Sequence, residues 1–571
     1  MSKPDSKTHS KPTDEVPEVD SSSISRRKFL GGLSGAAAVA ATGAVGAAAV
    51  LSGPEAEAEV GPLLGDDRLD AARDNRLVAV DRMVAVGMPA HPDNGDEARY
   101  GNLIGNYSKG LPHNYLGEVR PASYSKYLLA LSTGDPALFE AIPLGGARKL
   151  VNPQSGLSFD TEGNDPHQFV QPPAPALASA EEAGEGVELY WMALLRDTRF
   201  TDYERSELAQ RAAAELSQVS DFRGPRESGD VTPQTLFRDV PPGCTDGPYI
   251  SQFLLKGTPF GSEYVERRQR TLAAGSDHVT GFNEWLAVQN GNVPGSESFD
   301  RVRRFIRNGR DLAAWVHVDV LFQAYFNACL ILDTPPNPND QPTGGGIGCP
   351  VNPGNPYNNS RTQIGFGTWG SPARKALLCE VASRALKAVW YQKWYVHRRL
   401  RPEEYGGRIH VKKSGLANYP IHPDVLDSEA VSRVHAKYGT YLLPQAFPEG
   451  SPTHPSYGAG HGTVAGACVT ILKALFDESF VIPNPVVPSA DGLRLVAYNG
   501  PPLTVGGELN KIASNIGTGR NIAGVHWRTD AIESLRLGER VAMAVLRDTK
   551  ASNHENGSYT FTRFDGSRVT I

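Results

Sequence analysis

Hydrophobic positions recur at helical spacing over most of this chain, whereas the alternation typical of strands is short and rare. The longest helical pattern opens at Ser371 and Pro372, a favourable pair for a helix start, and runs without glycine or proline from Ala373 to Leu400. The predicted helices cover residues 181–195, 203–217, 262–269, 312–332, 372–399, 461–476 and 527–547. Strand signals are few and short, as at residues 560–563. The pattern therefore predicts a mainly α fold.

Loops rich in proline and glycine separate the predicted helices, notably at residues 335–371. That segment is too long for a plain connector, so we expect an ordered functional loop or lid. The chain has 571 residues, which is enough to bury a sizeable core. Its net charge is −6 and it has no basic stripe, so we expect no nucleic-acid partner.

The five cysteines are too sparse for a disulfide scaffold. A disulfide between Cys244 and Cys349 stays open, because spacing does not fix connectivity. Cys379 and Cys468 lie in apolar helical patterns, where we expect ordinary core residues.

The N-terminus is predicted to be a targeting segment. Residues 25–30 resemble a twin-arginine export motif, and an apolar stretch at 31–51 is followed by a cleavage-like site at 56–58. We therefore expect residues 1–58 to be an export signal and the protein to be periplasmic or extracellular. The alternative is an uncleaved membrane anchor, but a stretch so rich in alanine and glycine is weak as a span, so no stable membrane partner is expected.

Residues 451–462 carry the most informative motif. This turn, dense in proline, glycine and serine, presents His454 and His461 immediately before an apolar helical stretch. The first backbone N–H groups of a helix have no partner within the helix, and its dipole favours negative charge there. Small residues such as Gly460 let an anion approach the backbone closely. The motif indicates an oxyanion site.

An upstream cluster supplies positive charge. Lys393 and Arg401 are eight residues apart, about two turns of a helix with ~3.6 residues per turn, so both can face one side. Pro402 is expected to stop that helix. Taken alone, the cluster is typical of a basic helix end whose cations complement the dipole.

A downstream cluster contains Arg520, His526 and Asp530. His526 and Asp530 are four residues apart, so on a helix they share a face and the carboxylate can fix the tautomer of the imidazole. Taken alone, this is a capping histidine with an incidental ion pair. Taken with the other two clusters, it completes the set of lysine, arginine and histidine that a multiply charged oxyanion requires.

The order of these residues resembles the signature shared by vanadium-dependent haloperoxidases and type 2 acid phosphatases. Residues 393–398, 450–457 and 523–526, and more weakly 109–114, look like the bromoperoxidases of red algae. The resemblance covers roughly residues 65–560. It implies paired four-helix bundles with long loops and little strand, and a homo-oligomer. The expected parts are an N-terminal helical part at 59–310 and a C-terminal helical part at 311–571 that holds the site.

The resemblance also implies a vanadate cofactor and residue roles. His526 would be the ligand to vanadium, and His461 the general base that takes a proton from hydrogen peroxide. The vanadate oxygens would be neutralised by Lys393, Arg401, Arg520 and the Gly460 N–H. Lys393 would also polarise the peroxide. His454 replaces an aromatic residue that chloroperoxidases tend to carry, so we expect bromide and iodide as substrates, with small organic acceptors for the halogen.

One position departs from the family. Ala459 stands where a serine usually donates its hydroxyl to a vanadate oxygen, so one side-chain donor is lost. Four further histidines are expected to be ordinary helix or loop residues: His397, His410, His422 and His435.

Two other classes stay open. The same pocket can take a phosphate ester, with His526 as nucleophile, His461 as acid and Asp530 orienting the nucleophile. The length of the chain and residues 453–457 argue against such a phosphatase. The other alternative is an exported, non-catalytic binding protein, which would be indicated by loss of the charged trio Lys393, Arg401 and Arg520. That trio is intact.

Overall fold

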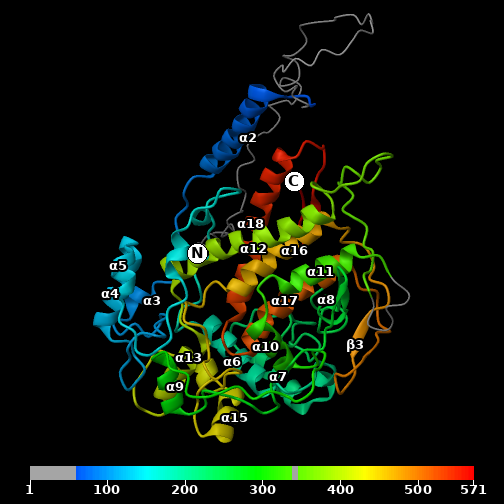
Figure 1. Cartoon of the computed structure of the whole chain (residues 1–571). Helices are drawn as coiled ribbons and strands as arrows, with labels where there is room; N and C mark the ends of the chain where they lie inside the picture. The colour runs from blue at the N-terminus through cyan, green and yellow to red at the C-terminus, as the bar shows by residue number, and fades with distance from the viewer. Residues whose placement is uncertain (1–59, 337–344) are drawn as a thin grey trace, which may run out of the picture. The chain divides into compact units, whose positions relative to one another are not determined.

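The computed structural model describes residues 60–336 and 345–571, and these are mainly α-helical, as predicted (Figure 1). The predicted export signal at 1–58 lies outside the described residues. The chain separates into two compact units, Met1–Met88 and Pro89–Ile571. In the first unit, helix α2 (Gly65–Val86) has two aspartates in its first turn, where they complement the helix dipole. The division expected at residue 310 stays a prediction.

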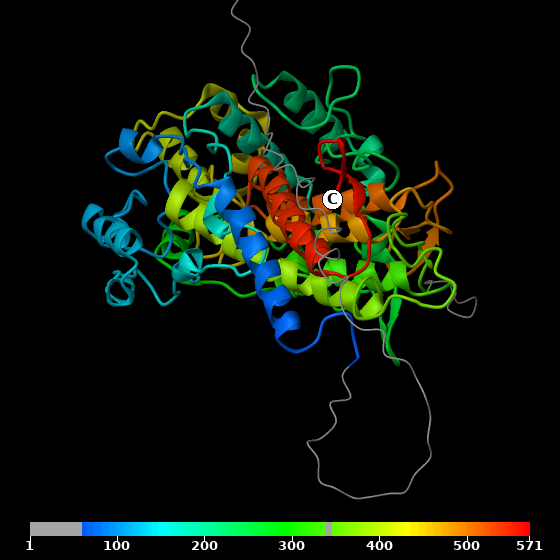
Figure 2. The same cartoon turned by 90° about the horizontal axis from the view of Figure 1, so that it is seen from above.

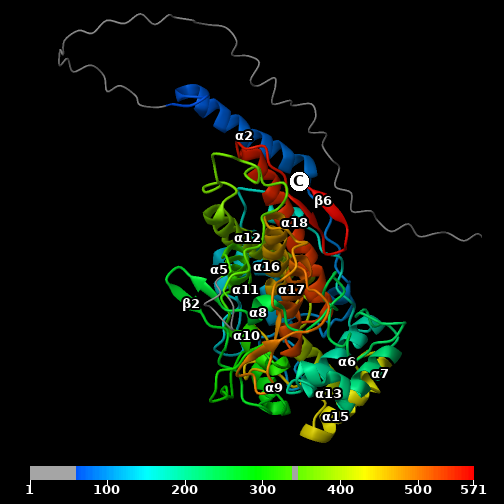
Figure 3. The same cartoon turned by 90° about the vertical axis from the view of Figure 1, so that its right-hand side faces the viewer.

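Four long helices pack together in the second unit (Figures 1 and 3). They are α12 (Ser371–Tyr391), α16 (Gly460–Leu475), α17 (Val505–Ile522) and α18 (Arg528–Ser552). Helix α16 contacts the other three, and seen from above α18 lies beside α12 (Figure 2). Glycine permits the close approach of α16 and α18: a Cβ at Gly466 would lie 2.1 Å from the Leu535 carbonyl oxygen. Within α16 every residue except His461 is buried.

Further helices surround this bundle. Helix α10 (Gly309–Val318) packs against α17, and α11 (Gln323–Asp333) packs against α12 and α16. Helix α6 (Ala180–Leu194) contacts α17 and three helices outside the bundle, which are α7 (Glu207–Gln218), α14 (Pro423–Leu426) and α15 (Glu429–Tyr438). The remaining helices are α3 (Asp96–Arg99), α4 (Pro121–Thr133), α5 (Pro136–Glu140), α8 (Gln252–Leu255), α9 (Phe282–Gln289) and α13 (Pro402–Lys413).

Strand is confined to antiparallel hairpins among the described residues. The pairs are β1 (Thr258–Phe260) with β2 (Glu263–Val265), β3 (Val486–Pro488) with β4 (Leu495–Ala497), and β5 (Thr560–Thr562) with β6 (Arg568–Thr570). Short 3-10 helices lie at η2 (Pro153–Leu157), η3 (Pro166–Gln168) and η4 (Phe200–Arg205). Strand β5 confirms the strand predicted near the C-terminus.

Some predicted helices are wrong. Residues 262–269 fall partly in the β1–β2 hairpin, because Gly261 at φ +60° permits the tight turn. The helix predicted at 312–332 is two helices, since Asp319 is extended (φ −64°, ψ 147°) and ends α10. The helix predicted at 203–217 begins only after Ser206, whose side chain accepts the Ala209 N–H as its N-cap.

The helix predicted at 372–399 ends early. After α12 the chain passes through a π-helix, η5 (Gln392–His397), and Arg398 then adopts a left-handed conformation. The expectation that Pro402 stops a helix is wrong. Pro402 instead starts α13, because proline at the first helical position has no N–H to leave unpaired. Lys393 and Arg401 therefore come from different elements.

All five cysteines are free, so Cys244 and Cys349 are not bridged. Residues 345–370 form turns anchored in part by Asn352, whose side-chain amide donates to the Thr560 carbonyl at 2.7 Å. The functional role expected for that loop stays a prediction. No single described helix is long and apolar enough to cross a membrane, although the bent pair α10 and α11 meets that test by length and composition.

Candidate active site

Residues from four separate segments meet at one point. Lys393 lies on η5, Arg401 caps α13, His454 lies in the loop before α16, and His526 lies between α17 and α18. Lys393 Nζ is 2.9 Å from His454 Nδ1, and an Arg401 guanidinium nitrogen is 2.8 Å from the same atom. Arg401 also reaches His526 Nε2 at 3.0 Å. The structure thus brings together the clusters that the sequence placed apart.

Three buried cations in this site have no carboxylate partner among the residues that the structure describes. Lys393 and Arg401 are fully buried and Arg520 is 5% exposed, and within the described part of the chain none of them forms an ion pair. They donate to backbone carbonyls instead, as Arg401 does to Val525 at 2.7 Å and Arg520 to Val316 at 2.7 Å. The Arg520 Nε is buried and has no hydrogen-bond partner within residues 60–336 and 345–571. Buried charges are normally paired, so this arrangement calls for an anion.

The electrostatics agree with that conclusion. Burial, and then repulsion by Arg401, hold the pKa of Lys393 well below its usual value. The same two causes lower the pKa of Arg520 to about 10. A multiply charged anion between these groups would relieve the repulsion and stabilise their charged forms.

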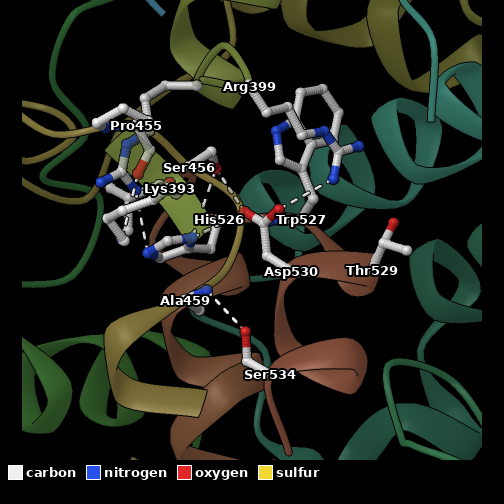
Figure 4. A network of polar contacts seen from close by, with 12 residues as sticks. Lys393, Arg399, Pro455, Ser456, Ala459, His526, Trp527, Thr529, Asp530 and Ser534 are labelled. Atoms are coloured by element: carbon white, nitrogen blue, oxygen red, sulfur yellow. Dashed lines mark hydrogen bonds and ion pairs between the residues drawn. The ribbon is translucent and has the colours of Figure 1, made fainter. Parts of the chain in front are cut away.

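His526 is held by a carboxylate on one side and faces the cations on the other. Its Nδ1 is 2.8 Å from Asp530 Oδ2 (Figure 4). Because a carboxylate only accepts, Nδ1 carries the proton and Nε2 presents its lone pair toward Arg401. Burial, followed by the charges of Arg401 and Lys393, lowers the pKa of His526 well below its usual value. The imidazole is therefore neutral and suited to bind a metal.

Asp530 is itself fixed by several donors. Arg399 donates to its Oδ1 at 2.9 Å, the Trp527 N–H donates to its Oδ2 at 3.1 Å, and the Ser456 hydroxyl donates to its Oδ2. Arg399 is also ion-paired with Glu182 on α6. This role of Arg399 could not be predicted from the sequence, because two other arginines lie within two residues of it.

His461 stands apart from the buried cluster. It is the second residue of α16, a fifth of its side chain is exposed, and its Nε2 is 3.0 Å from Asp319 Oδ1. Asp319 lies between α10 and α11, and its side chain is 3% exposed. Sequence reasoning missed Asp319 because a single helix was expected there. The one available signal was the acidic residue itself within a mostly apolar run.

Ala459 and Gly460 form the start of α16. Ala459 is the N-cap residue and its N–H donates to the Ser534 hydroxyl oxygen at 2.8 Å. The Gly460 N–H has no hydrogen-bond partner among the described residues. A Cβ at Gly460 would lie 3.1 Å from the Trp390 ring, so glycine keeps this helix start uncrowded.

His454 is buried between two cations. Its ring packs at 5.1 Å from Trp390, and burial, followed by the charge of Lys393, lowers its pKa well below the usual value. The four further histidines named from the sequence lie outside the cluster. His410 Nδ1 accepts the Tyr441 N–H, His422 Nδ1 accepts the Asp424 N–H, His435 stacks on Tyr441, and His397 packs edge-on against Tyr457.

Comparisons with known proteins identify the family. Residues 381–555 match the model of the VCPO second helical-bundle domain. The vanadium-dependent bromoperoxidase of Corallina officinalis is 35% identical over 88% of this chain and 98% of its own length. That of Ascophyllum nodosum is 34% identical over 89% of this chain and 93% of its own length.

A solved structure agrees with these relatives. The second vanadate-dependent bromoperoxidase of Ascophyllum nodosum, a homohexamer, matches with a TM-score of 0.83 and 31% identity over 92% of this chain and 94% of its own. The chain belongs to the vanadium-dependent haloperoxidases, in the family of the vanadium-dependent bromoperoxidases.

Proposed function

We propose that Lys393, Arg401 and Arg520 hold the oxygens of vanadate and that His526 Nε2 is its metal ligand. The protein is an enzyme that uses vanadate to oxidise halide with hydrogen peroxide, as the bromoperoxidase relatives indicate. The observation that supports the site assignment is the set of buried cations without a carboxylate partner, beside a neutral imidazole whose lone pair faces them. These residues fit a multiply charged oxyanion.

Vanadate bound at this site would supply a Lewis acid that activates hydrogen peroxide toward attack by halide. The residues of the chain provide the rest. The cations neutralise oxyanion charge, and Asp530 fixes the tautomer of His526 and raises its basicity as a ligand. Since the Asp319 carboxylate accepts the His461 Nε2–H, Nδ1 of His461 is the nitrogen that takes a proton from hydrogen peroxide. In the net reaction, halide, hydrogen peroxide and a proton give hypohalous acid and water.

Bromide and iodide are the proposed halides, with small organic molecules as acceptors of the halogen. His454 supports this preference, because its ring lies between Lys393 and Arg401 where chloroperoxidases tend to carry an aromatic residue. Initial rates with chloride, bromide and iodide at saturating vanadate test it. A chloride rate equal to the bromide rate would refute the preference.

Vanadate itself distinguishes this function from the phosphatase alternative. Chelator-treated protein is assayed for bromination and for hydrolysis of p-nitrophenyl phosphate, each with and without added vanadate. Vanadate should switch bromination on, and phosphate-ester hydrolysis should stay negligible. Hydrolysis that vanadate inhibits, without any bromination, would make the protein a phosphatase.

We also propose export and self-association. The twin-arginine-like motif at residues 25–30 supports a periplasmic or extracellular location. Comparing the processed N-terminus in hosts with and without the twin-arginine machinery tests it.

The homohexameric relative supports a homo-oligomer. Light scattering on the purified protein tests that proposal, and a monomer mass would contradict it.

A further inference from the structure

A second cavity lies away from the cationic site. Its volume is about 500 Å³, within the range of small-molecule sites. Its wall includes Ile306 and Arg307, just before α10, whereas Val316 near the other end of α10 contacts the cationic site. A ten-residue helix is about 15 Å long, so the two sites are separated by roughly that length.

Aromatic rings form much of the wall. Phe200 and Tyr249 stack in parallel with centroids 3.8 Å apart, and Tyr203 packs edge-on against Phe200 at 5.7 Å. Tyr498 and Pro248 also line the cavity. Tyr203 and Tyr249 are themselves buried, so the flat surface is offered by Phe200, Pro248 and Tyr498, which are each partly exposed. Such a surface favours a planar apolar ligand.

The charge in the cavity is positive and partly unpaired. Three arginines line it, against Glu204 as the one carboxylate in the lining. Arg199 is ion-paired with Asp202, and Arg307 is ion-paired with Asp311.

Arg238 differs from the other two arginines. Within the described residues it forms no ion pair, and it donates to the Cys244 and Gly247 carbonyls, each at 2.9 Å. Its guanidinium lies 5.2 Å from the centroid of the Tyr249 ring. The carbonyl bonds fix the guanidinium in place without neutralising it. A fixed cation beside an aromatic wall suits an anion attached to a ring.

We propose that this cavity binds an aromatic carboxylate of one or two rings, with its ring against the aromatic wall and its carboxylate at Arg238. The proposal does not depend on the vanadate chemistry, because none of the residues that line the cavity belongs to the cationic cluster.

Fluorescence titration of the full, vanadate-loaded protein with 2-naphthoate tests this proposal. The uncharged 2-naphthalenemethanol is the matched probe. Arg238→Gln should weaken naphthoate binding roughly ten- to hundredfold, the worth of a hydrogen bond to a charged group. Arg301→Gln, at an exposed arginine outside the cavity, should leave binding unchanged.

Three results would overturn the proposal. The first is that naphthoate binds Arg238→Gln as tightly as the wild type. The second is that the uncharged probe binds as tightly as naphthoate. The third is that naphthoate binds only after vanadate has been removed. The third result would place the probe in the cationic cluster. Should Arg238→Gln fail to fold by circular dichroism, Tyr498→Ala at the partly exposed rim takes its place and should also weaken naphthoate binding. Unchanged binding there would equally refute the site.

Discussion

Asp530 Oδ2 lies 2.8 Å from His526 Nδ1, while Arg399 donates to the other oxygen of the same carboxylate at 2.9 Å. Asp530 is completely buried, so its negative charge acts on these neighbours with little screening by water. The hydrogen bond between His526 Nδ1 and Asp530 holds the imidazole in the tautomer whose Nε2 faces Arg401. The position and protonation of the proposed vanadium ligand therefore depend on a carboxylate that does not touch the anion.

Replacing that carboxylate should weaken cofactor binding. In Asp530→Asn the amide can offer its N–H to Nδ1, which would favour the wrong tautomer of His526. We expect vanadate affinity to fall roughly ten- to hundredfold, the usual effect of losing such a partner. Vanadate titration with bromination as the readout measures it. Glu533→Gln, at another carboxylate of α18, is the control, and equal affinities in both variants would refute the role of Asp530.

The proposed general base depends on Asp319. His461→Ala should still bind vanadate, but turnover should fall by about two to four orders of magnitude, the usual worth of a positioned general base. Asp319→Asn should lower kcat and shift its pH profile more strongly than it changes vanadate affinity, because its ion pair is with His461 and only its longer-range charge acts on Arg520. A loss of vanadate affinity with normal turnover per bound vanadium would contradict these roles.

Serine at position 459 should strengthen anion binding. Ala459 is the N-cap of α16, and a serine there can accept a backbone N–H of the first turn while donating its proton to an oxyanion. Ala459→Ser should therefore raise vanadate affinity roughly ten- to hundredfold. If a water already makes that bond, the change is small. Weaker vanadate activation in Ala459→Ser would show that this side chain does not face the cofactor.

A buried histidine outside the site should make stability depend on pH. Burial, followed by the charge of Arg398, lowers the pKa of His397 to about 3, below the ordinary value of about 6.5 that it regains on unfolding. Between these values the unfolded chain binds a proton that the folded chain does not, so stability falls as the pH drops from about 6.5 toward 3. From pH 7 to pH 5 the free energy of unfolding should therefore fall by about 2 kcal/mol less in His397→Phe than in the wild type.

Urea unfolding at both pH values measures this effect. His435→Phe, at an exposed histidine, is the matched control and should lose as much stability as the wild type. An equal pH dependence in His397→Phe and the wild type would show that His397 titrates normally in the folded protein.

The residue types of the site could be predicted from the sequence, but their geometry could not. Lys393, Arg401 and His526 stand out because multiply charged anions need such side chains, and because their order matches a family signature. The sequence could not show that η5 and Pro402 place the first two on different elements, since a π-turn has no clear sequence signal.

Contacts between segments that lie far apart in the chain also could not be predicted from the sequence. Arg398 and Arg399 are adjacent, yet Arg398 is ion-paired with Glu97 and Arg399 with Asp530. Only the tertiary packing determines which carboxylate each of these two neighbouring arginines contacts. Asp319 was missed for a related reason, because its partner His461 is more than a hundred residues away. Mainly α architecture was predictable because the long buried helices have strong helical periodicity.

The central claim is that His526 binds vanadate and that bromination depends on that bond. Chelator-treated wild type and His526→Ala are titrated with vanadate in the presence of hydrogen peroxide and bromide, with His410→Ala as a control at a histidine outside the site. The wild type and His410→Ala should gain bromination that saturates with vanadate, whereas His526→Ala should remain inactive at every vanadate concentration. Normal bromination by His526→Ala at saturating vanadate would contradict the claim.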